Sequence, residues 1–256
     1  MSSSLKRKGD GDLEASLSKR SAFTDGDFVG DDEKTIAYKN WVYEKACVHG
    51  DLEAVKFFVD LGCDPQKPIS MVCKAGHVDV LKYLVSAGAD ARINSDWALQ
   101  QACQYGHINL VQELIQTFGA NVNANHNAPL RRAIEFGNLD LVKFLVEHGA
   151  YDNEAIGISC WWDHLDIARY LRSLDQFSTQ EVNGFTVLYV CENGALETIK
   201  FLISIGAKMS TKIIVDRNKV LAPHGLATTT PQQLLRKAAA KANVELYDCL
   251  LQLICD

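Results

Sequence analysis

The sequence lacks the features that mark several common classes of protein. Its 256 residues have no basic excess, since 26 Lys and Arg stand against 32 Asp and Glu, giving a net charge of -6. Nucleic-acid binding, by contrast, depends on a dense basic surface. No apolar run approaches the about 18 residues of a membrane span, and the start, MSSSLKRKGDGD, has no hydrophobic signal segment. Asn-x-Ser/Thr sequons are absent as well. We therefore expect an intracellular protein with no nucleic-acid or membrane partner.

Motifs of common enzyme classes are also missing. The chain has no phosphate-binding loop, dinucleotide fingerprint, nucleophile elbow or HExxH metalloprotease motif. Eight cysteines are present, and in a reducing cytosol they stay mostly as thiols. One stretch does look like a reactive centre: CWWDHLD, residues 160–166, gathers Cys160, Asp163 and His164, whose side-chain types bind zinc and other transition metals. A Cys/His metal or thiol enzyme is therefore one hypothesis to weigh.

Internal repetition organises the rest of the chain. The segments 45–64, 72–90 and 132–150 align so that their glycines and aliphatic residues coincide. A reference position, just before the second half of each unit, recurs seven times at steps of 26, 30, 31, 26, 31 and 48 residues. It holds Gly50, Gly76, Gly106, Gly137, Asp163, Gly194 and Ala242. The sequence thus consists of about seven degenerate units.

Each unit is predicted to form two short helices. After the reference position, apolar residues recur at three-to-four spacing, as in Leu139, Val142 and Leu145, which is typical of an amphipathic helix. A shorter helix precedes the reference position, and Gly-Ala or a variant ends the pair. An Asp or Glu three residues after the reference position favours the start of the second helix. The residue directly after it is often one that hydrogen-bonds at a helix start, and we expect its histidines to tie the loop to that start.

The units resemble ankyrin repeats. The stretch APLRRA, residues 128–133, stands where that family has Thr-Pro-Leu-His-x-Ala, and NLDLVKFLVEHGA and HVDVLKYLVSAGAD are similar to its second helix and turn. The resemblance covers about residues 41–256 and implies an all-α solenoid of about seven stacked helix-turn-helix units with short connecting loops. The family's unit has about 33 residues, and most units here are shorter. We therefore expect trimmed connecting fingers, most of all where the step is 26.

Composition and register predict four parts of the chain. Residues 1–33 form a disordered tail, residues 34–210 hold repeats one to six, residues 211–231 are an insertion loop and residues 232–256 form a C-terminal capping repeat. The insertion is a lid over the last groove, a peptide motif for a partner, or an elaborated loop. Polar capping units favour a monomer. The tail contains two basic clusters, Lys6, Arg7 and Lys8 in the first and Lys19 and Arg20 in the second. They resemble a bipartite nuclear import signal. Alternatively, they are simply part of a solvated tail.

The register accounts for the apparent reactive centre. The position three residues before the reference position forms a column across the units. It holds Ile134 and Ala239 in two units and five of the eight cysteines in the others, namely Cys47, Cys73, Cys103, Cys160 and Cys191. Free cysteine behaves there as a small apolar residue. Adjacent stacked helices lie about 8–10 Å apart, too far for disulfides or a shared zinc ion. His164 likewise repeats the place of His77 and His107. We interpret the cluster as scaffold and expect no metal, no cofactor and no catalytic residue.

Two positions of each first helix should face away from the core. The apolar residue seven positions before the reference position is taken to point toward the core. The residues two and one before the reference position then point about 140° and 120° away from that direction around the helix axis. Aromatic rings occupy them in three consecutive units. The ankyrin resemblance implies that first helices line a concave groove and that this pair contacts partners. The predicted partner-binding residues are Gln104, Tyr105, Glu135, Phe136, Trp161, Trp162, Glu192 and Asn193. Alternatively, the rings cover gaps left by short fingers.

The leading hypothesis is therefore a non-enzymatic protein–protein interaction module, an adaptor or scaffold that holds a partner protein against its concave face. One alternative is a nuclear regulatory cofactor, imported through the basic tail, in place of a cytoplasmic adaptor. The Cys/His metal or thiol enzyme is the third hypothesis, and the register of the repeats argues against it.

Overall fold

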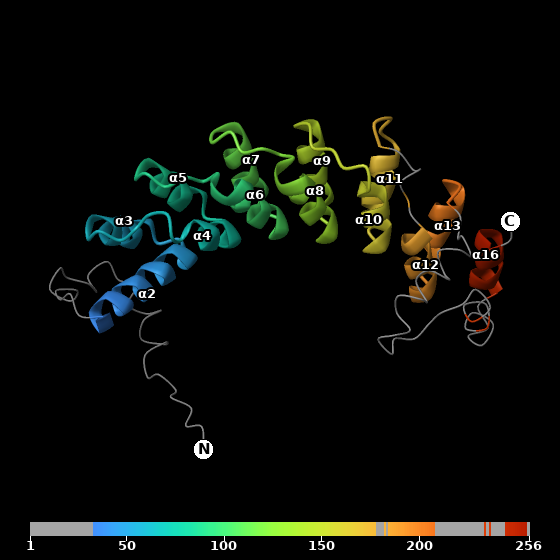
Figure 1. The fold of residues 1–256 in the computed structure, drawn as a ribbon, viewed down its shortest axis with the longest axis horizontal. Helices are drawn as coiled ribbons and strands as arrows, with labels where there is room; N and C mark the ends of the chain where they lie inside the picture. Colours follow the sequence, from blue (N-terminus) through green and yellow to red (C-terminus); the bar gives the residue numbers. More distant parts are fainter. Residues whose placement is uncertain are drawn as a thin grey trace, which may run out of the picture. The chain divides into compact units, whose positions relative to one another are not determined.

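The structure, a computed structural model, describes residues 33–177, 182, 184–207, 233, 236 and 244–254. In these ranges all regular secondary structure is α-helical, in thirteen helices (Figure 1), as the predicted all-α fold requires. The predicted import signal, the insertion loop, Cys255 and the reference position Ala242 lie outside the described residues. Glu33, which the sequence places in the tail, is the first residue of α2.

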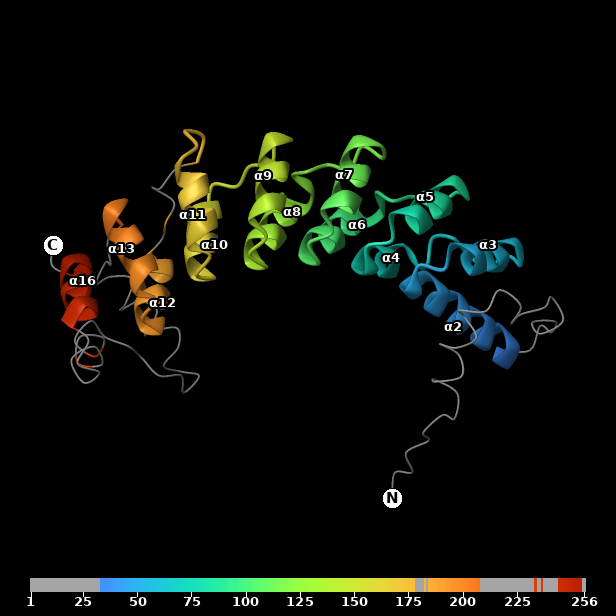
Figure 2. The same cartoon turned by 180° about the vertical axis from the view of Figure 1, so that it is seen from behind.

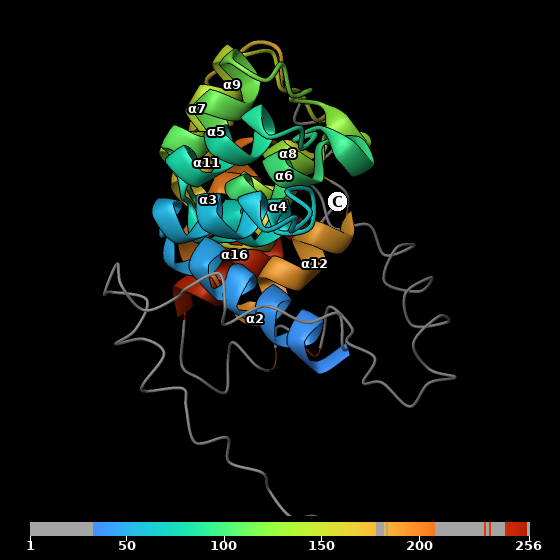
Figure 3. The same cartoon turned by 90° about the vertical axis from the view of Figure 1, so that its left-hand side faces the viewer.

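The first of two compact units, Met1–Asn121, contains three described helix pairs. Its first helices are α2 (Glu33–His49), α4 (Ile69–Ala75) and α6 (Ile93–Gln104), and its second helices are α3 (Leu52–Asp60), α5 (Val78–Ser86) and α7 (Ile108–Gln116). Within this unit α4 packs between α2 and α6, while α5 packs between α3 and α7 (Figures 1 and 3). The two sets of helices therefore form two layers, with the apolar faces of each pair between them.

The second unit, Val122–Asp256, repeats this arrangement. Its first helices are α8 (Ala124–Glu135), α10 (Ala155–Trp161) and α12 (Gly184–Asn193), and its second helices are α9 (Leu139–Glu147), α11 (Leu165–Arg172), α13 (Leu196–Ser204) and α16 (Val244–Ile254). Within the unit α10 packs between α8 and α12, α11 packs between α9 and α13, and α16 packs on α13 (Figure 2).

The connecting segments are short, as predicted. Residues 61–68, 87–92, 117–123 and 148–154 join successive helix pairs without any strand. The expectation that the first helix of each pair is the shorter one is wrong for α2, α6, α8 and α12, which have 17, 12, 12 and 10 residues against 9 in each of their second helices. Residues 94–96 and 125–127, at the starts of α6 and α8, have φ between 48° and 63°. Five of these six residues are Asn, Asp or His, the non-glycine types that tolerate this left-handed region best.

The reference position has one backbone conformation throughout the described repeats. Its glycines have φ between 71° and 83°, a left-handed geometry that glycine adopts without steric cost. Asp163 adopts the same geometry with φ 61°. The assignment of Asp163 to the reference position is thereby confirmed, because the aspartate turns the chain where the other described repeats use glycine.

Histidines connect successive repeats, and their role differs from the predicted one. In none of the three helices that follow His77, His107 and His164 does a side chain cap the helix start. Instead, each Nε2 lies within hydrogen-bonding distance of a carbonyl oxygen in the preceding repeat, at 2.8 Å, 2.7 Å and 3.1 Å respectively. The imidazole reaches past its own helix start, whereas the shorter Asp51 and Asn138 do cap theirs.

The histidine bridges explain where glycine is needed. A Cβ at Gly50, Gly76 or Gly137 would lie 2.5–2.6 Å from a ring atom of the next repeat's histidine. The repeat after Asp163 has alanine, Ala195, in place of the histidine. The space is therefore open to a side chain, and the Asp163 carboxylate accepts a hydrogen bond from the Thr198 hydroxyl at 2.5 Å. Aspartate thus replaces both the glycine and the bridge at this junction.

Candidate functional site

The predicted aromatic positions of the C-terminal unit lie at the surface. Phe136, at the end of α8, is 52% exposed. Trp161, the last residue of α10, is 37% exposed, and Trp162, directly after it, is 45% exposed. Because 100° per residue turns these positions away from the buried stripe of the same helices, their exposure agrees with the geometry expected from the sequence.

Trp161 also packs against its neighbouring repeat. Its ring lies parallel to that of Tyr189 on α12, with centroids 3.9 Å apart and an interplanar angle of 5°. Such pairs contribute about 0.5–1.5 kcal/mol beyond the area they bury. Trp161 therefore joins α10 to α12 while remaining partly exposed. Among the described residues, Trp162 has no stacked ring partner of this kind.

The polar residues predicted beside the rings have different environments. Glu135 is half-buried and pairs with Arg132 at 2.8 Å, and its backbone carbonyl lies 3.1 Å from Nε2 of His164. On α12, Glu192 is half-buried and Asn193 is exposed. Glu135 is thus already part of the junction between repeats, while Asn193 is open to contact.

Gln104 and Tyr105, the remaining predicted residues, belong to the N-terminal unit. Gln104 is half-buried, and Tyr105 is 49% exposed with its ring nearly parallel to that of His107, at 6.5 Å between centroids. The first helices of this unit carry further exposed rings that the sequence reasoning missed. Trp97 is 41% exposed and donates from Nε1 to the Ser70 hydroxyl at 3.3 Å, which bridges α6 and α4.

A simple signal could have found the missed aromatic residues. Positions five and nine before the reference position are rotated by about 160° from the core direction at 100° per residue, so they extend the same outward stripe. Tyr189 occupies the first of these positions, and Trp41 and Trp97 occupy the second. The prediction considered only the last turn of each first helix and therefore stopped one turn too early.

The apparent reactive centre is dispersed in the fold. Cys160 is 1% exposed, and burial together with the nearby Asp163 charge raises the pKa of its thiol to about 12. His164 bridges to the Glu135 carbonyl, and Asp163 binds Thr198. Within the ranges that the structure covers, no three or more His, Cys, Asp or Glu side chains gather as metal ligands. The three residue types share a sequence segment but not a site.

The column of cysteines is buried as the register predicts. Cys47, Cys73, Cys103, Cys160 and Cys191 are all between 0% and 3% exposed, and the seven described cysteines are free thiols. Burial raises the pKa of Cys191 to about 12, with smaller contributions from Glu192 and Cys249. A thiol is a nucleophile only as the thiolate, so these side chains are suited to packing.

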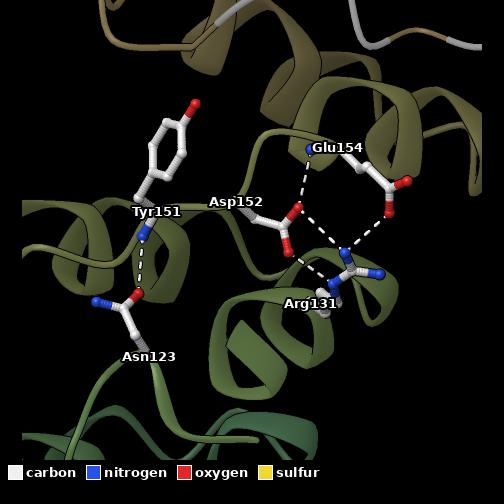
Figure 4. Close-up of polar contacts among 5 residues, drawn as sticks. All are labelled: Asn123, Arg131, Tyr151, Asp152 and Glu154. Carbon is white, nitrogen blue, oxygen red and sulfur yellow. Dashed lines mark hydrogen bonds and ion pairs between the residues drawn. The ribbon is translucent and has the colours of Figure 1, made fainter. Parts of the chain in front are cut away.

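An ion-pair network fixes the segment that leads into α10 (Figure 4). The Asp152 carboxylate is fully buried and accepts from Nε of Arg131 at 2.6 Å and from the backbone N–H of Glu154 at 2.8 Å. Nη2 of Arg131 also donates to Glu154 at 2.8 Å. The side-chain oxygen of Asn123 accepts from the backbone N–H of Tyr151 at 3.0 Å. The helix that carries the tryptophans therefore starts from a rigid support.

The chain is a tandem helical-repeat protein. Its helix pairs recur, its turns are left-handed at a fixed position of each repeat, and the same columns of residues are buried in successive repeats. Residues 43–126 and 69–156 match the family model described as ankyrin repeats (3 copies). Over these residues the chain consists of ankyrin repeats, and ankyrin repeats are generally protein–protein interaction modules. The resemblance to this family that the repeat motifs indicate is thus confirmed over the matched residues.

Two relatives share part of the sequence. The ankyrin repeat protein L63 of Acanthamoeba polyphaga mimivirus is 33% identical over 54 residues, which cover 21% of this chain and 9% of that protein. Leucine-rich repeat serine/threonine-protein kinase 1 of Mus musculus is 32% identical over 102 residues, which cover 36% of this chain and 5% of that protein. The chain thus spans less than a tenth of either relative. None of the helices in the described ranges has the length and apolar character needed to cross a membrane.

Proposed function

We propose that this chain is a non-enzymatic adaptor that binds a partner protein through the outward faces of its first helices. In the C-terminal unit the anchors are Phe136, Trp161 and Trp162, with Asn193 beside them. In the N-terminal unit Tyr105 occupies the equivalent position. The observation that carries the proposal is the exposure of large rings at one register position in consecutive repeats, on helices whose opposite sides are buried.

The exposed rings are large enough to matter for binding. An aromatic side chain buries 150–250 Å² when fully covered, so the 45% exposure of Trp162 leaves about 100 Å² for a partner to cover. At about 25 cal/mol per Å² this area corresponds to about 2.5 kcal/mol, or about sixtyfold in affinity. Single tryptophans of this weight are typical of binding hot spots.

Replacing Trp162 with alanine tests the proposal. The full chain and the Trp162→Ala variant are used for affinity capture from a cell extract, followed by identification of the proteins lost. We expect the variant to lose its main partner while its urea unfolding midpoint changes little. Val244→Ala is the matched control, because Val244 is 71% exposed but lies at the start of α16, a second helix.

The companion variant Trp161→Ala separates binding from packing. Because its ring stacks on Tyr189, we expect it to lower the free energy of unfolding by about 1 kcal/mol more than Trp162→Ala does. Unchanged capture by Trp162→Ala would contradict the proposed function. A large loss of stability in Trp162→Ala would show that this ring, too, serves packing.

A further inference from the structure

Two neighbouring glutamines of α6 are buried, but their side chains differ in hydrogen bonding. Gln100 is 2% exposed, and its Nε2 donates to the Ser95 carbonyl oxygen at 2.8 Å. Gln101 is 3% exposed, and among the described residues its side-chain amide has no hydrogen-bond partner. A buried amide without a partner is costly, because it loses its bonds to water and gains none in return. We therefore expect Gln101 to lower the stability of the free chain, which calls for a functional explanation.

Gln101 faces the same side of α6 as two exposed rings. Trp97 lies four residues before it and Tyr105 four residues after it, so at 100° per residue both lie within about 40° of its direction. Gln101 occupies the position five before the reference position, which points away from the core. The equivalent residues of the same unit are exposed Lys45 and half-buried Met71. The amide of Gln101 is therefore covered by surface side chains, and rotation of those side chains can uncover it.

Side-chain amides elsewhere in the chain pair with backbone N–H and C=O groups of neighbouring segments. Nε2 of Gln66 donates to the Asp90 carbonyl oxygen at 3.0 Å, and Oε1 of Gln66 accepts from the N–H of the same residue at 2.7 Å. The Asn123 amide also makes one bond of each kind, donating to the Gly149 carbonyl oxygen and accepting from the Tyr151 N–H. These are the two kinds of bond that paired residues of antiparallel strands exchange. An unpartnered primary amide is thus suited to binding extended backbone.

We propose that Gln101 hydrogen-bonds the backbone of an extended segment of the partner protein, while the rings of Trp97 and Tyr105 pack on either side of that segment. In an extended chain the N–H and C=O of one residue point to the same side, so a single residue offers both a donor and an acceptor to the amide. Each bond that forms removes part of the cost of leaving the amide buried without a partner. The inference deepens the proposed function, on which it rests, by naming the chemistry that the α6 face recognises.

The stability of the free chain tests whether the amide lacks a partner. Methionine has nearly the shape of glutamine without its polar amide, so Gln101→Met should raise the melting temperature by about 3 °C. Gln100→Met is the matched control, because it removes an existing hydrogen bond from an equally buried neighbour, and it should lower the melting temperature by a similar amount. A fall for Gln101→Met would show that the amide is satisfied in the free chain, for example by an ordered water, and would overturn the inference.

The binding probe is selected from a phage library of random peptides of about twelve residues, which extend to about 40 Å. Peptides that bind the immobilised full chain are depleted on the Tyr105→Ala variant, so that only peptides that depend on this face remain. The strongest of them is synthesised and titrated with the full chain by isothermal calorimetry. We expect Gln101→Met to weaken its binding about tenfold, as two hydrogen bonds allow, and Gln100→Met to leave its binding unchanged.

Methylation of the peptide backbone locates the hydrogen bond. Each backbone nitrogen of the selected peptide is methylated in turn, which removes one N–H donor and keeps the side chain. At one position, methylation should weaken binding to the parent chain about fivefold and should have little further effect on binding to Gln101→Met. Absence of such a position, or equal binding of the unmethylated peptide to the parent chain and to Gln101→Met, would overturn the inference. A selection that yields no peptide dependent on Tyr105 would overturn it as well.

These outcomes keep the inference apart from the proposed function. A peptide that depends on Tyr105 but not on Gln101 leaves the adaptor function standing and shows that the role given to Gln101 is wrong. Unchanged partner capture by Trp162→Ala contradicts the adaptor function, whatever the peptide does. Success of both requires Trp162→Ala to lose the captured partner and Gln101→Met to lose affinity for the peptide.

Discussion

Replacing Gly76 with alanine tests whether the histidine bridges hold successive repeats together. Gly76 has φ +83°, and a Cβ there would lie 2.6 Å from Nδ1 of His107. Nε2 of the same ring lies 2.7 Å from the Lys74 carbonyl oxygen. A left-handed alanine costs about 1–2 kcal/mol, and displacing the ring from its acceptor adds about 1 kcal/mol. We therefore expect Gly76→Ala to lower the free energy of unfolding by about 2–3 kcal/mol.

Two controls isolate the contribution of the bridge. Gly62 also has φ +83°, but a Cβ there would meet nothing within 4 Å. Gly62→Ala should therefore cost only the backbone strain, about 1–2 kcal/mol. In a His107→Ala background the ring is gone, so Gly76→Ala should again cost about 1–2 kcal/mol. The resulting double-mutant cycle should give a coupling energy of about 1 kcal/mol between the two residues.

The assay is urea unfolding of the full chain, followed by far-UV circular dichroism, with the m-values compared between variants. That comparison matters because repeat proteins can unfold in parts. Equal losses for Gly62→Ala and Gly76→Ala would refute the reasoning. So would a loss from Gly76→Ala that is the same with and without the His107 ring.

Three further predictions concern Cys73, Asp163 and Arg131. Burial raises the pKa of the Cys73 thiol from 9.0 to about 12, so the thiol loses its proton at lower pH in the unfolded state than in the folded state. The free energy of unfolding should therefore fall between those pH values by up to about 1.4 kcal/mol per pH unit. Urea titrations at about pH 8 and pH 10 should show a smaller fall for Cys73→Ala than for the parent chain, and an equal fall would contradict the prediction. Asp163→Gly should change stability by less than about 1 kcal/mol, because relief of left-handed strain offsets the lost Thr198 hydrogen bond, whereas Asp163→Ala should cost more in the same titration. Arg131→Met should cost about 3–5 kcal/mol by leaving the Asp152 carboxylate buried without its cation, and adding Asp152→Asn should recover part of that loss in calorimetry.

Much of the fold follows from the sequence because the repeat register carries it. The same column that holds Cys47 and Cys103 in the sequence is buried in the structure, and the reference position is left-handed even at Asp163. A period repeated several times averages out single-residue ambiguity, so apolar columns and helix boundaries are readable. The identity of the family and the all-α class were therefore predictable.

Contacts between repeats were not predictable in the same way. A histidine after the reference position suggests a helix cap, yet His77 and His107 bond the preceding repeat. Whether the histidine caps its own helix or bonds the preceding repeat depends on the length of its side chain and on the space beside the glycine of the preceding repeat. The sequence of a single repeat shows neither. Tyr189 was missed for a related reason, since its stacking on Trp161 joins two units. Sequence periodicity describes each unit well and the interface between units poorly.

Side-chain amides hold the short connecting segments of successive repeats against each other. The Gln66 side chain bonds both the N–H and the C=O of Asp90, at 2.7 Å and 3.0 Å, which are the two bonds of a strand pair. Asn123 spans the next finger of its own unit in the same way, with the Tyr151 N–H and the Gly149 carbonyl. Because side-chain amides hold these segments against each other, the segments need no projecting hairpin. Less of the chain then reaches out beyond the helices, and the ends of α6, α8 and α10 are among the places where large rings meet solvent.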